Sequence, residues 1–112
     1  MDKNLIYKIK NNTFSVGIIG LGYVGLPLSL KFLNKKINVV GFDINQSIIK
    51  QLNLKKKFHI ETISKRFINQ NFRKYFQATN NFEEIKNVDI IIICVPTPLK
   101  KNKLPNLSYI TN

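Results

Sequence analysis

Four short apolar runs divide the chain, and each has the length of a β-strand. They cover residues 14–19, 37–42, 76–79 and 88–95. The fourth contains four successive isoleucines, and such dense β-branched runs are typical of central parallel strands that are covered on both faces. We therefore expect four strands, with the last one in the interior of a parallel sheet.

The segments between these runs carry apolar residues three and four positions apart, which predicts helices that pack on a sheet. The predicted helices cover residues 23–35, a segment from Asn45 through Leu52, residues 62–72 and a short segment from Asn80 through Ile85. Asn45 is a suitable N-cap, and Asn80 with Glu83 three positions on resembles a capping box. Residues 55–61 are expected to form a loop.

Strands that alternate with helices predict an α/β fold. The order β-α-β-α-α-β-α-β favours a Rossmann-type parallel sheet with right-handed crossovers and helices on both faces. We expect a flexible lead-in over residues 1–13 and a partial domain over residues 14–112, truncated after the fourth strand and without a substrate domain.

The chain carries a formal charge of +12, from 18 basic and 6 acidic residues, which raises the possibility of nucleic-acid binding. Its lysines are scattered, however, apart from a cluster at 55–57 and a smaller group at 100–103. Only Arg66 and Arg73 supply arginine, the preferred reader of bases. A solvated basic surface therefore explains the charge better than a nucleic-acid partner.

No apolar run approaches the roughly 18–20 residues that cross a membrane. The longest, 88–95, is interrupted by Asp89, and the lysine-rich N-terminus has no apolar core that would suggest a secretion signal. We expect a cytoplasmic protein with no membrane partner. The single cysteine, Cys94, provides neither a disulfide nor a metal constellation, and we expect it to be a small buried apolar side chain.

The main candidate chemistry lies between the first predicted strand and the first predicted helix, where Gly20, Gly22 and Gly25 form the motif G-L-G-Y-V-G. In this context the first glycine permits a tight turn, the second lets the backbone approach a pyrophosphate, and the third lets the helix pack close to the strand. The helix directs free N–H groups and the positive end of its dipole at the phosphates. The ordered context favours a dinucleotide site over a simple turn.

Two further motifs fall at strand ends. Asp43 follows the second strand, 18 residues after Gly25, and an acid at about this spacing accepts hydrogen bonds from the adenine ribose of NAD. Pro96-Thr97-Pro98 follows the fourth strand. Because ligands of such folds bind outside the carboxyl ends of the strands, the three motifs are expected to meet at one edge of the sheet, with NAD as the cofactor.

With these motifs the chain resembles the nucleotide-sugar 6-dehydrogenases, the UDP-glucose/GDP-mannose dehydrogenase family, and among them the UDP-N-acetylglucosamine 6-dehydrogenase branch. The matching segments are V-G-I-I-G-L-G-Y-V-G-L-P-L at 16–28, G-F-D-I at 41–44, F-Q-A-T at 76–79, D-I-I-I-I-C-V-P-T-P-L at 89–99 and P-N-L-S-Y-I at 105–110. The resemblance covers nearly the whole chain from Ser15 on.

This resemblance implies an oxidoreductase of polysaccharide biosynthesis that oxidises the C6 hydroxyl of a nucleotide sugar to a carboxylate in two successive NAD-dependent steps. It implies that Tyr23 and Val24 line the phosphate loop, that Asp43 holds the adenine ribose, and that Thr97 contacts the cofactor. Other roles are open for three of these residues, since Val24 also fits a core position, Tyr23 a surface position and Thr97 a turn.

The sequence departs from the family pattern at two positions near the adenine side. Leu54 and three lysines stand where the family has a glycine, and Ile48 stands where many members have a basic residue. The family enzymes are also several times longer, and their catalytic cysteine, lysine and asparagine come from later segments that are absent here. We therefore expect no catalytic residue and no metal ligand in this chain.

On this interpretation the 112-residue chain is inactive alone, a UDP-sugar binds only in the full-length enzyme, and the apolar fourth strand promotes self-association. His59 lacks partners for general-base chemistry and is expected to be a loop residue. Two alternatives are a fragment of another Rossmann hydroxyacid dehydrogenase and a stand-alone nucleotide-binding module with a basic surface.

Overall fold

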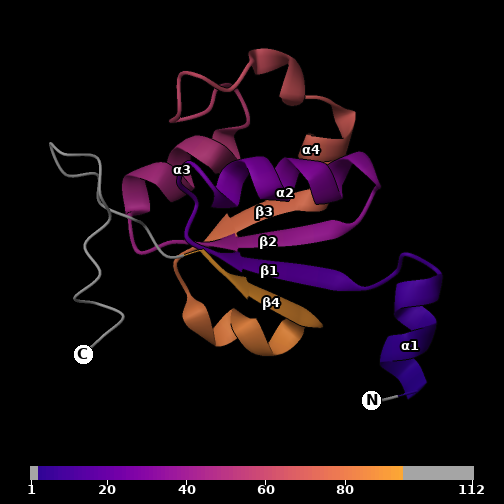
Figure 1. Ribbon diagram of the computed structural model, residues 1–112. Coiled ribbons are helices and arrows are strands. Elements are labelled where there is room, and N and C mark those ends of the chain that lie inside the picture. Colours follow the sequence, from indigo (N-terminus) through magenta and orange to yellow (C-terminus); the bar gives the residue numbers. More distant parts are fainter. Residues whose placement is uncertain (1–2, 95–112) are drawn as a thin grey trace, which may run out of the picture.

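Four parallel strands form the sheet of the computed structural model, which describes residues 3–94 (Figure 1). The strands are β1 (Ser15–Ile19), β2 (Asn38–Phe42), β3 (Phe76–Thr79) and β4 (Ile90–Ile93). Their order in the sheet is β3-β2-β1-β4, and every pairing is parallel. The predicted α/β fold with a Rossmann-type sheet is therefore confirmed.

Helices connect the strands and cover the sheet unevenly. They are α1 (Lys3–Lys10), α2 (Gly25–Asn34), α3 (Gln46–Leu54) and α4 (Gln70–Tyr75), with 3-10 helices at Lys65–Phe67 and Phe82–Asn87. In Figure 1, α2, α3 and α4 gather near β2 and β3, whereas the second 3-10 helix lies beside β4. None of the helices found within residues 3–94 is both long and apolar enough to span a bilayer.

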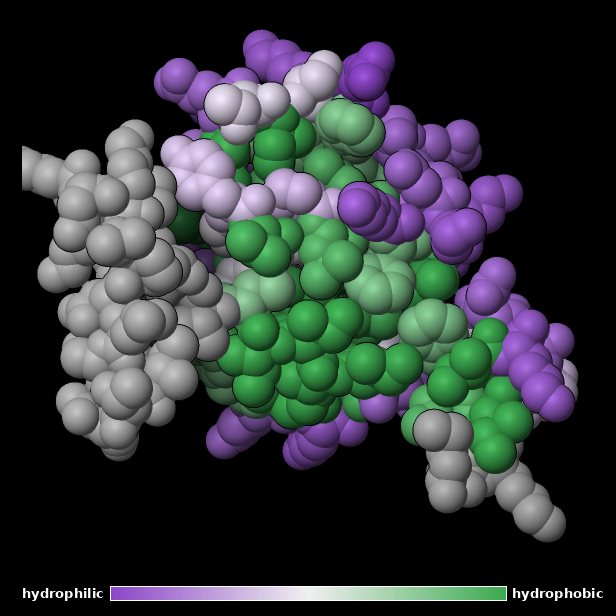
Figure 2. Space-filling view, viewed as in Figure 1, coloured by the Kyte–Doolittle hydropathy of each residue, from purple (hydrophilic) through white to green (hydrophobic). Residues whose placement is uncertain are grey.

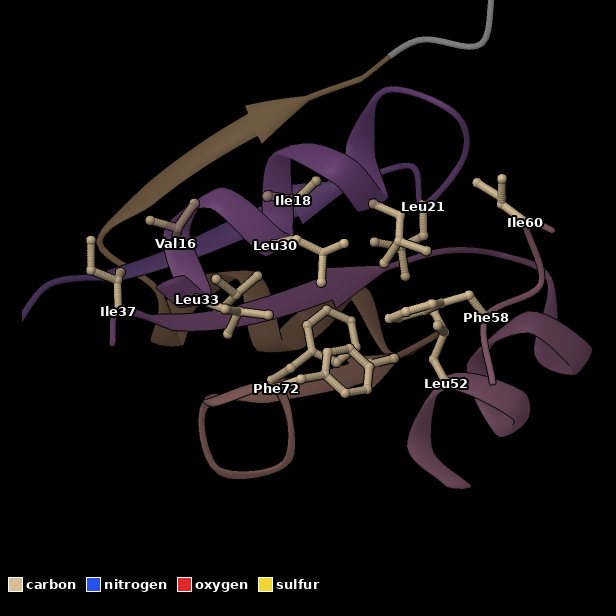
Figure 3. Packing of buried hydrophobic residues seen from close by; sticks show 14 of the residues in the cluster. Val16, Ile18, Leu21, Leu30, Leu33, Ile37, Leu52, Phe58, Ile60 and Phe72 are labelled. Atoms are coloured by element: carbon tan, nitrogen blue, oxygen red, sulfur yellow. The ribbon is translucent and has the colours of Figure 1, made fainter. Parts of the chain in front are cut away.

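The main core lies between the sheet and α2, α3 and α4 (Figure 3). Val16, Ile18 and Val39 project from the strands and are almost inaccessible to solvent, as are Leu30 and Leu33 of α2 in the same cluster. Burying one such side chain contributes about 1.5–3 kcal/mol, so this layer holds the first two strands and α2 together.

Three phenylalanines extend the core toward the segment that joins α3 to α4. The ring of Phe72 stacks on Phe76 with centroids 4.9 Å apart and meets Phe58 edge-on at 5.2 Å. Phe58 and Ile60 are each only 6% exposed. The predicted loop over 55–61 is irregular as expected, but it is anchored by buried side chains.

The opposite face of the sheet is covered by the crossover from β3 to β4. The ring of Phe42 lies 5.7 Å from the ring of Phe82, and a Cβ added to Gly17 would lie 2.9 Å from a Val88 methyl group. The sheet therefore has side chains packed on both faces, although this second face is covered only by the short crossover within residues 3–94.

β4 differs from the expected interior strand. Within residues 3–94 it pairs only with β1, and Ile91 and Ile93 are 43% and 66% exposed. Figure 2 also shows apolar side chains gathered where Figure 1 draws β1 and β4. The isoleucine run forms a parallel strand, as predicted, but it lies at the edge of the described sheet.

The helix starts confirm one predicted cap and correct two other predictions. Asn45 caps α3, since its side-chain oxygen accepts hydrogen bonds from the N–H groups of Ser47 and Ile48. The continuous helix predicted over 62–72 is wrong. Ser64 caps the 3-10 turn and Asn69 caps α4, so these two polar side chains start two short elements in place of one helix.

The predicted capping box is displaced by one residue. Asn81, rather than Asn80, accepts a hydrogen bond from the Glu83 N–H at 3.1 Å, and the helix that follows is a 3-10 helix. Sequence alone also did not predict α1, which forms within the segment expected to be a loose lead-in.

Candidate functional site

Two of the three motif glycines are required by the shape of the turn between β1 and α2. Gly20 has φ +96°, and a Cβ there would lie 2.3 Å from the carbonyl oxygen of Cys94. A Cβ on Gly25 would lie 1.7 Å from the carbonyl oxygen of Gly20. No side chain fits at either position without moving the backbone, because real contacts of this kind are much longer.

Gly22 differs from both. Among residues 3–94, nothing lies within 4 Å of a Cβ added at Gly22, and the residue is exposed. Packing therefore does not explain a glycine here. The open space lies beside the start of α2, where a bound pyrophosphate needs room to approach the backbone, so the cradle fits a dinucleotide.

The start of α2 offers free hydrogen-bond donors. Its N-cap residue, Val24, makes no side-chain cap, and within residues 3–94 no acceptor meets the four backbone N–H groups from Gly22 to Gly25. Tyr23 is 79% exposed and Val24 is 66% exposed, which excludes a core role for Val24 among the described residues. Uncapped donors and the positive end of the helix dipole together favour an anionic ligand.

Asp43 lies at the carboxyl end of β2 and reaches back to the glycine loop. Its Oδ2 accepts a hydrogen bond from the Leu21 N–H at 3.0 Å, and its Oδ1 accepts one from the Asn45 N–H at 3.0 Å. The carboxylate is therefore held in place beside the loop. Each oxygen can still accept a further hydrogen bond, which leaves capacity for ribose hydroxyls.

Backbone hydrogen bonds bring the predicted motifs to one edge of the sheet. The Gly20 N–H donates to Phe42 O at 2.8 Å, and the Cys94 N–H donates to Ile19 O at 2.8 Å. The glycine loop, Asp43 and the end of β4 are thus neighbours, as expected. Thr97 lies outside the described residues, so its contact with the cofactor stays a prediction.

The departure from the family pattern after α3 has a structural explanation. Lys55 occupies the left-handed position at the end of α3, with φ 56°, where a glycine is usual. Its Nζ donates hydrogen bonds to Arg73 O at 2.7 Å and to Phe76 O at 2.8 Å, and burial lowers the pKa of the amine. These bonds offset the strained backbone and connect α3 to β3.

Sequence reasoning missed one residue beside the glycine loop. The Nε2 of His59 hydrogen-bonds the carbonyl oxygen of Leu21, the residue between the first two motif glycines. No spacing rule connects a histidine 38 positions downstream to this loop, so only the fold reveals the contact. Cys94 is a half-buried free thiol, and no three His, Cys, Asp or Glu residues within 3–94 are grouped as a metal site.

Residues 14–112 match the sequence profile described as the UDP-glucose/GDP-mannose dehydrogenase family, NAD binding domain. The chain belongs to this family. This match confirms the family resemblance and the NAD cofactor that were expected from the sequence. It also rules out the alternative that the chain is a fragment of another Rossmann hydroxyacid dehydrogenase. Among the family's members, a UDP-N-acetyl-D-mannosamine dehydrogenase of Campylobacter jejuni is 42% identical over 106 residues, covering 89% of this chain and 24% of the relative.

Two further relatives support the assignment. The UDP-N-acetyl-D-glucosamine 6-dehydrogenase of Salmonella typhi is 40% identical over 93 residues, covering 83% of this chain and 21% of its own. The solved structure of the UDP-D-ManNAc dehydrogenase of Pyrococcus horikoshii has a TM-score of 0.68 at 34% identity, covering 86% of this chain and 23% of that one. The chain thus spans less than a quarter of the length of these family members.

Proposed function

We propose that this chain is the N-terminal, NAD-binding part of a nucleotide-sugar 6-dehydrogenase that oxidises the C6 hydroxyl of a UDP-sugar to a carboxylate. The observation that carries the proposal is Gly22, which faces space left open by residues 3–94. It lies beside four N–H groups at the start of α2 that have no acceptor among those residues. A glycine that packing does not require is explained by a ligand that needs its space.

Different residues of the site would bind different parts of NAD. The N–H groups from Gly22 to Gly25 would hold the pyrophosphate, and Asp43 would accept hydrogen bonds from the adenine ribose. Tyr23 and Val24 would line the phosphate loop, with Thr97 contacting the cofactor from the segment after β4. NAD, when bound, accepts a hydride from the substrate carbon.

The chain would bind the cofactor without turning over a sugar. Oxidation at C6 needs a base for the alcohol proton and a nucleophile for the aldehyde, and the described residues that would bind NAD supply neither. We place these groups, and the UDP-sugar site, in later segments of a longer cytoplasmic enzyme of polysaccharide biosynthesis, as the family resemblance implies.

We also propose that the 112-residue chain self-associates. Ile91 and Ile93 expose apolar surface on β4, which is paired on one side only within residues 3–94. An open strand edge with exposed apolar side chains favours pairing with another chain.

Titration calorimetry on the purified chain tests the proposal, with NAD, NADP and UDP-N-acetylglucosamine as separate titrants. We expect binding of NAD, weaker binding of NADP, and no NADH absorbance when NAD and the sugar nucleotide are supplied together. The matched control is Gly22→Val, which should keep the circular dichroism spectrum and lose NAD binding. A folded wild-type chain that does not bind NAD would overturn the proposal.

A further inference from the structure

Leu21 is held from both sides of its backbone. Its N–H donates to Asp43 Oδ2 at 3.0 Å, and its carbonyl oxygen meets His59 Nε2. The side chain is 1% exposed and packs beside Gly41 of β2, where an added Cβ would lie 2.7 Å from a Leu21 methyl group. Leu21, between two motif glycines, is therefore held in place by its backbone bonds and its buried side chain, whereas Gly22, Tyr23 and Val24 beside it are exposed.

The bond to Leu21 places a hydrogen on Nε2 of the His59 ring. A carbonyl oxygen only accepts hydrogen bonds, so Nε2 must carry the hydrogen and donate it. Nδ1 is buried and has no partner among residues 3–94. The ring thus buries a polar atom, at a cost to stability, while its other nitrogen makes a single bond to the glycine loop.

The position of this ring is set by its neighbours in the chain. Phe58 and Ile60, on either side of His59, are each 6% exposed, and Figure 3 shows both side chains directed into the core. The edge-on contact between Phe58 and Phe72 adds a further restraint. The imidazole is consequently presented to the loop by a rigid support rather than by a free side chain.

Because the peptide group is planar, fixing the Leu21 carbonyl also fixes the direction of the Gly22 N–H. In a trans peptide the carbonyl of one residue and the N–H of the next point in opposite directions. Because His59 holds the Leu21 carbonyl on its own side, the Gly22 N–H is turned to the other side. That N–H has no acceptor within residues 3–94, and Gly22 borders open space.

We propose that His59 is a positioning residue of the dinucleotide site: its Nε2–H fixes the Leu21–Gly22 peptide so that the Gly22 N–H faces the pyrophosphate. The proposal rests on the NAD-binding function proposed above. It assigns a binding role to the segment between α3 and α4, which the glycine–acid motif does not include. Asp43 fixes the preceding peptide in the same way, so the two side chains orient consecutive peptide groups of the loop.

The test compares His59→Phe, which keeps a ring but no donor, with His59→Gln, which keeps a donor. Thr62→Ala, an exposed change in the same segment, is the matched control. In the ligand-free chain, nitrogen-15 spectra should show the hydrogen of His59 on Nε2, and His59→Phe should shift the Gly22 amide signal. Calorimetry should then give NAD binding about five- to tenfold weaker for His59→Phe, and within about twofold of wild type for His59→Gln and the control.

The outcomes separate this proposal from the proposed function. If the wild type binds NAD and His59→Phe binds it equally well, the positioning role is wrong and the NAD site stands. If the wild type does not bind NAD but the Gly22 amide still moves in His59→Phe, the function fails while the peptide restraint stands. A ring with no hydrogen on Nε2 would also overturn the positioning role. Should His59→Phe not fold, the more adaptable His59→Met takes its place in the same comparison.

Discussion

The amine of Lys8 lies 3.1 Å from Oδ1 of Asp89, a residue 81 positions further along the chain. This ion pair joins α1 to the start of β4. The other carboxylate oxygen accepts a hydrogen bond from the Ser15 N–H at 2.9 Å, at the start of β1. One half-buried carboxylate therefore connects the N-terminal helix and two neighbouring strands.

We expect Asp89→Asn to destabilise the fold in a pH-dependent manner. The Ser15 N–H first, and then Lys8, hold the pKa of Asp89 below its ordinary value of 3.8. A carboxylate with a lowered pKa contributes stability that is complete above the unfolded pKa and is lost as pH falls through the folded pKa. The variant should lose about 1–2 kcal/mol of unfolding free energy at pH 7, a modest figure because the carboxylate is partly exposed, and less at pH 2.

Urea unfolding of both proteins at the two pH values measures this difference. The control is Glu61→Gln, which neutralises an exposed carboxylate in a loop. It should cause no pH-dependent loss of stability. An equal loss of stability for Asp89→Asn at pH 7 and pH 2 would mean that the charge of the carboxylate is not what matters.

Substitution by alanine should affect stability differently at Gly25 and at Gly22. Gly25→Ala forces a methyl group to within 1.7 Å of a carbonyl oxygen, so we expect a loss of about 3 kcal/mol or more of unfolding free energy. Gly22→Ala places the methyl group in open space and should change stability by less than about 1 kcal/mol. Thermal melts followed by circular dichroism measure both, and similar losses at the two positions would contradict the geometry.

The cofactor preference should depend on Asp43 in two distinguishable ways. Asp43→Ala removes the proposed ribose acceptor and the bond to the Leu21 N–H, and should weaken NAD binding by roughly 1.5–3 kcal/mol. Asp43→Asn keeps an acceptor for Leu21 but removes the charge that repels the 2′-phosphate of NADP. We therefore expect Asp43→Asn to narrow the affinity gap between NAD and NADP with less loss of NAD binding. Tighter binding of NADP than NAD by the wild type would refute the assignment of Asp43.

Lys55 gives a test of how the chain compensates for a missing glycine. Lys55→Met removes both donated hydrogen bonds and keeps the left-handed backbone strain, so it should cost about 1–3 kcal/mol. Lys55→Gly loses the same bonds but relieves the backbone by about 1 kcal/mol, and should be the milder change. Denaturant midpoints of the two variants check this order, and a glycine variant that is less stable than the methionine variant would contradict it.

Self-association should depend on the exposed side of β4. The double change Ile91→Thr with Ile93→Thr keeps β-branched residues but removes apolar surface, so we expect a shift toward the monomer in light scattering. Ile44→Thr, at a side chain that is 84% exposed elsewhere, is the matched control and should have no effect. An unchanged mass for the double variant would show that another surface mediates association.

The sequence predicted the parts of this fold that depend on local pattern. The four strands, the Asn45 cap and the placement of Gly20 and Asp43 at one sheet edge follow from strand-length apolar runs and from turn chemistry. The helix over 62–72 was wrong because Ser64 and Asn69 bond to nearby N–H groups and restart the chain, a competition that apolar spacing does not register.

The features that could not be predicted depend on long-range contacts. α1 is connected to β4 through Lys8 and Asp89, and lysine-rich sequence alone gave no sign of it. The contact between His59 and Leu21 spans the segment after α3 and the glycine loop, which become neighbours only when β2 pairs with β1. The edge position of β4 in the sheet formed by residues 3–94 follows from strand order, which an apolar run does not specify.

The space that residues 3–94 leave open at Gly22 bears on how this loop changes under selection. A screen that rewards only folded chains should accept a small side chain in place of glycine at position 22. It should reject any side chain at positions 20 and 25, because backbone atoms confine those two. A descendant that no longer needed its ligand would therefore lose the middle glycine first and keep its outer pair. In a set of diverged sequences, the identity of residue 22 would then distinguish copies that still bind from copies that merely fold.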